Sequence, residues 1–76
     1  MAKKKIIVEC MGYPMDIVEV NELSTPEETL KDLVCNKGYP TSISVMSVDL
    51  FELISGKKFD EKAMLKAIAE ANTARH

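Results

Sequence analysis

The segment "TPEETLKDLVCNKGYP" at residues 25–40 constrains the fold of this chain more than any other feature. Thr25 suits the N-cap of a helix, and Glu28, three residues later, completes a capping box. Gly38 suits the end of the helix, since glycine readily adopts the left-handed conformation found there. The pattern predicts a helix over residues 26–37. The apolar side chains at helical spacing form one face to bury: Leu30, Leu33 and Val34.

Segments rich in β-branched residues lie on both sides of this helix, which excludes an all-helical fold. Residues 4–11 alternate between apolar and polar types and predict a half-buried strand. Residues 15–20 predict a second strand, joined to the first by a short turn that contains glycine and proline. Residues 41–48 predict a third strand with apolar side chains on both faces.

The C-terminal third contains two further segments. Residues 49–55 have apolar side chains at helical spacing, with Asp49 as the expected N-cap, and predict a short helix. An extended third strand or a separate fourth strand is the alternative. Gly56 and the lysines after it form a connector, because the glycine pattern of a phosphate-binding loop is missing. Asp60 caps a final helix over residues 61–73, which should bury Met64, Leu65, Ile68 and Ala71.

Together these elements predict an α+β fold in which helices pack on one face of a small, three-stranded, mainly antiparallel sheet. With 76 residues the chain is expected to form a single domain, with residues 1–4 as a flexible basic lead and residues 74–76 as a frayed end. The apolar side chains on both faces of the second and third strands exceed what one layer of helices covers. Dimerisation, or docking to a larger protein, would cover the surplus.

Composition argues against several classes of function. The chain has one histidine, His76, and two cysteines, Cys10 and Cys35, which we expect to be buried, reduced thiols. This set is too small for a zinc site or for a nucleophile–base pair, so no metal, cofactor, small-molecule substrate or catalytic residue is predicted. No segment has the roughly 20 apolar residues that span a membrane, and no export signal is evident. We therefore expect a cytoplasmic protein that is not an enzyme.

Charge is unevenly distributed, and it suggests a binding surface. Seven acidic residues and one lysine lie between Glu9 and Asp32, a local charge of −6. Such a surface attracts a basic protein partner and repels nucleic acid. The candidate partner-binding residues are Glu19, Glu22, Glu27, Glu28, Asp32, Tyr13 and Tyr39. The predicted function is a protein-binding module, an inhibitor or modulator of a larger host complex, acting through this acidic surface and a sheet edge. Small inhibitor proteins of phages share this format.

Two other functions remain open. The first is association with nucleic acid through the lysines Lys3, Lys4, Lys5, Lys57, Lys58 and Lys62. The second is an accessory subunit of an enzyme, whose site another chain completes. The partner in the leading prediction is another protein or a second copy of this chain.

Overall fold

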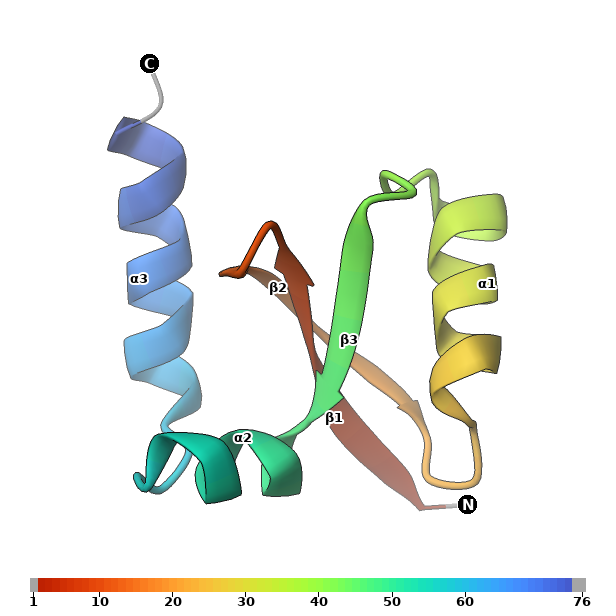
Figure 1. Cartoon of the computed structure of the whole chain (residues 1–76), viewed down its shortest axis with the longest axis horizontal. Helices are drawn as coiled ribbons and strands as arrows, with labels where there is room; N and C mark the ends of the chain where they lie inside the picture. The colour runs from red at the N-terminus through yellow and green to blue at the C-terminus, as the bar shows by residue number, and fades with distance from the viewer. Residues whose placement is uncertain (1, 75–76) are drawn as a thin grey trace.

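The computed structural model describes residues 2–74 and contains three antiparallel strands and three helices in this range (Figure 1). In chain order the elements are β1 (Lys3–Cys10), β2 (Tyr13–Asn21), α1 (Pro26–Lys37), β3 (Ile43–Ser47), α2 (Val48–Ser55) and α3 (Glu61–Ala74). The strand order is β2-β1-β3, so β1 is central and pairs antiparallel with both neighbours. The predicted α+β class is confirmed.

Helices cover both faces of the sheet, whereas the sequence predicted helices on one face (Figure 1). Adjacent strand residues point to opposite faces, and Ile7 and Val8 of β1 are both fully buried. Ile7 packs with Met64 of α3, whereas Val8 packs with Leu33 of α1 and Ile43 of β3. The central strand was expected to be half-buried, and it is buried on both sides because α1 and α3 each cover one.

The ends of α1 form as the sequence predicts. The Thr25 hydroxyl oxygen accepts the Glu28 backbone N–H at 3.2 Å, and the Glu28 carboxylate accepts the Thr25 backbone N–H at 3.0 Å. At the other end Gly38 is left-handed, with φ 74°, and Tyr39 donates its backbone N–H to the Leu33 carbonyl at 3.0 Å. The capping box and the glycine stop therefore set the limits of the helix at residues 26 and 37.

The segment after β3 is a helix, α2, which begins one residue earlier than predicted. Ser47 is its N-cap instead of Asp49, and its hydroxyl oxygen accepts the Leu50 backbone N–H at 3.1 Å. The Glu52 carboxylate accepts the backbone N–H of Phe59 at 2.7 Å. Gly56 ends the helix with φ 72°, so the glycine and the lysines after it do form a connector.

The final helix, α3, begins at the predicted position. The Asp60 carboxylate accepts the Ala63 backbone N–H at 3.2 Å. Met64 and Ile68 are buried against the sheet as expected, but Leu65 is 45% exposed. Ala71, also predicted to be buried, is exposed.

Both chain ends extend further into regular structure than predicted. Lys3 and Lys4, expected in a flexible lead, belong to β1 and pair with Asn21 and Val20 of β2. Residue 74 ends α3, while the predicted frayed positions 75 and 76 lie outside the described residues.

Candidate protein-interaction surface

Helix α2 exposes most of its large apolar side chains. Leu50 is 44% exposed, Leu53 is 80% exposed and Ile54 is 67% exposed. Their spacing of three and four residues places them on one side of the helix. We call these three residues the α2 ridge. Phe51, which is next to Ile54 around the helix, packs inward against Phe59, with a distance of 6.1 Å between ring centroids. Phe51 therefore attaches α2 to the core, Leu50 is partly covered, and Leu53 and Ile54 are left largely uncovered.

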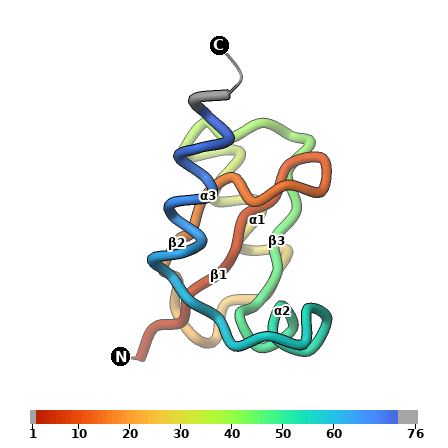
Figure 2. Tube along the Cα trace, turned by 90° about the vertical axis from the view of Figure 1, so that its left-hand side faces the viewer, coloured from red at the N-terminus to blue at the C-terminus, as the bar shows by residue number. Residues whose placement is uncertain are grey.

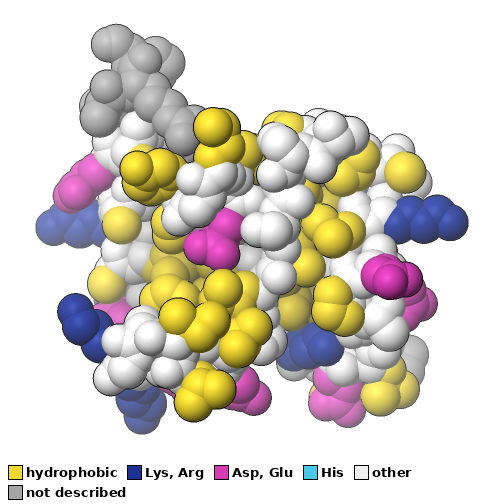
Figure 3. Space-filling view, viewed as in Figure 1, with side chains coloured by type: hydrophobic (Ala, Val, Ile, Leu, Met, Phe, Trp, Pro, Cys, Tyr) yellow, Lys and Arg dark blue, Asp and Glu magenta, His cyan; other side chains and the backbone are white. Residues whose placement is uncertain are grey.

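A second group of exposed apolar side chains lies at the turn between β1 and β2. Met11 is 85% exposed and Tyr13 is 66% exposed. We call these two residues the hairpin end. Figure 2 shows that this turn and α2 protrude on the same side of the molecule, past β3. In Figure 3, which views this side directly, hydrophobic side chains gather over α2 and at several points above it.

The two sheet edges differ in how open they are. On β2, proline at position 14 has no N–H to donate, and the register with β1 shifts next to it. The backbone N–H of Ile17 is bound at 2.8 Å by the carboxylate of Asp16. These features discourage pairing with another strand along β2. The β3 edge lies on the same side as the hairpin end and the α2 ridge (Figure 1).

The predicted acidic residues do not form one patch. Glu19 pairs in register with Lys5, on the face of the sheet that α3 covers. Glu22 is exposed in the turn before α1, and Glu27 and Glu28 lie in the first turn of α1, across the sheet.

Two of the acidic side chains on α1 have local partners. The Glu28 pKa is lowered, first because its carboxylate accepts the Thr25 backbone N–H. Asp32 accepts a hydrogen bond from the Asn36 amide at 2.8 Å and lies 3.8 Å from the Lys37 ammonium. Glu22 and Glu27 are exposed and take part in no ion pair within residues 2–74, so they are the acidic side chains on this side best able to steer a partner.

The two tyrosines have different surroundings. Tyr39 packs against the cluster of Val8 and Leu33, and its hydroxyl donates to the Asp16 carboxylate at 2.5 Å. That hydrogen bond, together with burial, raises the pKa of Tyr39. Tyr39 therefore holds α1 and β2 together, whereas Tyr13 is exposed and available for binding.

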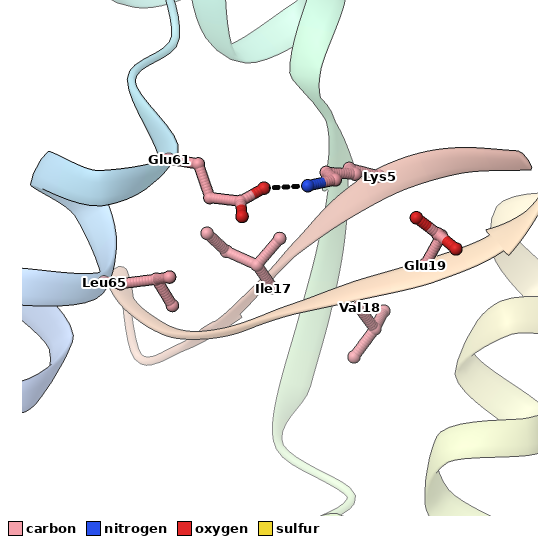
Figure 4. Close-up of a pocket in the computed structure, with 6 residues that line it drawn as sticks. All are labelled: Lys5, Ile17, Val18, Glu19, Glu61 and Leu65. Carbon is pink, nitrogen blue, oxygen red and sulfur yellow. Dashed lines mark hydrogen bonds and ion pairs between the residues drawn. The ribbon is translucent and has the colours of Figure 1, made fainter.

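The N-terminal lysines alternate between the two faces of β1. Lys4 donates to the Ser24 carbonyl at 3.1 Å, beside the start of α1. Lys5 points the other way and forms an ion pair with Glu61 at the start of α3, which raises its pKa (Figure 4). This alternation divides the first lysine cluster, whereas Lys57, Lys58 and Lys62 are exposed around the connector between α2 and α3.

Within residues 2–74, no three His, Cys, Asp or Glu side chains are grouped so that they could bind a metal ion. Cys10 and Cys35 are free thiols, but the prediction that both are buried is wrong. Cys10 is half-buried, and Cys35 is exposed because it lies on the side of α1 away from Leu33. His76 lies outside the described residues. None of the helices in this range is long and apolar enough to cross a membrane. No protein-family model matches the chain, and no curated protein or solved structure is significantly similar to it.

Proposed function

We propose that this chain is a small, non-enzymatic protein-binding module. The observation that carries the proposal is the gathering of exposed large apolar side chains on one side of the molecule, in the α2 ridge and the hairpin end. An exposed apolar group of this kind typically marks a protein-binding surface. Tyr13 adds a residue type that is enriched among the strongest contacts of protein interfaces.

The proposed contact with another protein centres on the hairpin end. Met11 is a flexible apolar side chain that fits pockets of varied shape, and Tyr13 beside it can both pack and hydrogen-bond. The neighbouring β3 edge extends this surface along the same side of the molecule. An inhibitor or modulator role follows if the bound protein uses the covered surface for its own activity.

This surface favours a protein partner over a nucleic acid. The three N-terminal lysines are divided between the two faces of β1, and two of them, Lys4 and Lys5, already have partners, so they do not form one basic face. The apolar side chains of the ridge and the hairpin end offer nothing to a phosphate backbone, which is bound by positive charge.

The test is capture of partners from a nuclease-treated bacterial lysate with the tagged full chain, read by mass spectrometry. We compare it with a hairpin variant, Met11→Ser with Tyr13→Ser, and with a matched control, Leu23→Ser. Leu23 is 81% exposed but lies in the turn between β2 and α1.

The chain and the Leu23→Ser control should retain one protein in near-stoichiometric amount, and the hairpin variant should lose it. The proposal is overturned if nothing is retained above an unrelated tagged protein. Equal retention by the hairpin variant would also overturn the assignment of this surface.

A further inference from the structure

We propose that the α2 ridge binds a second copy of this chain, with the two α2 helices antiparallel about a two-fold axis near Leu53. The inference extends the proposed function, since both start from apolar side chains exposed on one side of the molecule. It assigns the ridge to self-association and leaves the hairpin end for another protein. The assembly would then present two hairpin ends, which strengthens binding to a partner that has two sites.

The outward side of α2 carries charge as well as apolar groups. At about 100° per residue, Asp49, Leu53, Leu50 and Ile54 follow one another around this side of the helix. Asp49 is exposed at the N-terminal end, and the exposed Lys57–Lys58 pair follows the C-terminal end. Within residues 2–74 none of these three charged side chains takes part in an ion pair.

The order of these charges selects an antiparallel second copy. Reversing one α2 against another places Asp49 of each copy beside the Lys57–Lys58 pair of the other. A parallel arrangement would place like charges together and align the two helix dipoles unfavourably. About a two-fold axis the same surface of each copy contacts the other, so each contact between Asp49 and the lysine pair occurs twice. Charge complementarity across an interface sets the orientation in which partners bind.

The local shape allows close contact along this arrangement. Leu53, the most exposed residue of the ridge, would meet its own copy at the axis. Leu50 would then lie near Gly56 of the second copy. Glycine has no side chain, and the space above Gly56 is open to 4 Å. The backbone of one copy can therefore receive the leucine of the other.

The association is expected to be weak. Helix α2 has eight residues, so the contact is smaller than the roughly 1,200 Å² typical of stable complexes. A dissociation constant on the order of 0.1 mM fits a contact of this size.

The first test is sedimentation of the purified full chain from about 10 µM to about 1 mM, a range that brackets this constant. The mass should rise from 8.5 kDa toward twice that value. Leu53→Asp should remain monomeric over the whole range. The control Leu23→Asp places the same change at an equally exposed site away from α2 and should dimerise like the original chain.

The second test exchanges the charges. Asp49→Lys alone, or Lys57→Asp with Lys58→Asp, should weaken the dimer about three- to tenfold, as expected for exposed pairs. Combining all three substitutions should recover most of the affinity, because the complementarity is restored in reverse. The control Glu70→Lys makes the same change of charge at an exposed position of α3, away from α2, and should leave the dimer unchanged. Circular dichroism of every variant checks that the fold is retained.

Three results would overturn the inference. The first is a mass of 8.5 kDa at every concentration, and the second is a dimer that survives Leu53→Asp. The third is a triple variant that dimerises no more tightly than the weaker of the two variants it combines. These results are separable from the proposed function. A monomer that still captures a partner through the hairpin end would leave that function intact. A dimer that captures nothing would overturn that function alone.

Discussion

Replacing Leu33 by alanine should remove a large part of the stability of the fold. Leu33 is 1% exposed and joins α1 to the sheet through Val8 and Ile43. Truncating a buried leucine costs about 2–5 kcal/mol, because contacts are lost and a cavity remains. At about 0.05–0.15 kcal/mol per residue, a chain of this length has a free energy of unfolding of about 4–11 kcal/mol. At the middle of both ranges the substitution should therefore remove about half of it.

Leu53→Ala is the matched control, since the side chain removed is the same and only the exposure differs. Leu53 is 80% exposed, so the free energy of unfolding should change by less than about 0.5 kcal/mol. The assay is urea denaturation followed by far-UV circular dichroism at about 5 µM, where self-association contributes little. The reasoning fails if Leu33→Ala costs less than about 1 kcal/mol, or if the two variants are equally destabilised.

Three further changes test local contacts. Thr25→Ala removes the N-cap of α1 and should lower the free energy of unfolding by about 0.5–2 kcal/mol in urea, whereas Thr25→Ser should lose much less. Glu28 has a pKa below its ordinary 4.5 in the folded chain, so its carboxylate stabilises the fold above that pH, and this contribution disappears as the pH falls through the lowered value. An NMR titration that places the Glu28 pKa at or above 4.5 would contradict the capping box. Tyr39→Phe removes the hydroxyl that donates to Asp16 and should lower the free energy of unfolding by about 1 kcal/mol. The double variant with Asp16→Ala should lose less than the sum of the two single variants, because both remove the same hydrogen bond.

Local signals explain why α1 could be predicted from the sequence to the residue. The capping box and Gly38 each act within a few residues of the helix end, so the sequence contains everything that decides where the helix starts and stops. The start of α2 is harder to predict, because Ser47 and Asp49 are both good N-caps. Ser47 takes that role because β3 ends there, and the strand's length depends on pairing with β1.

Contacts between distant segments explain what the sequence could not predict. Lys5 and Glu9 flank Ile7 in the alternating pattern, which is typical of a strand face open to water. In the structure Ile7 is fully buried, because α3 returns to cover that face and Lys5 pairs with Glu61 at its edge. Nothing near Ile7 in the sequence shows that a helix more than 50 residues later will pack on it.

The same limit applies to the candidate binding residues. Acidic residues between positions 19 and 32 are close in sequence, but β2 and α1 place them on opposite faces of the sheet. The α2 ridge did leave a signal. Leu50, Phe51, Leu53 and Ile54 spread over more of the circumference than one buried side of a short helix can use.

That excess changes the reason for expecting self-association. The sequence predicts self-association from β2 and β3, because their apolar side chains lie on both faces. In the structure the chain supplies this cover itself, since Ile17 of β2 packs with Ile7 beneath α3 and Val45 of β3 packs beneath α1. The uncovered apolar surface lies on α2, the one helix with no buried residue. A partner is therefore expected at the α2 ridge and the hairpin end, where binding does not compete with the core that holds the fold together.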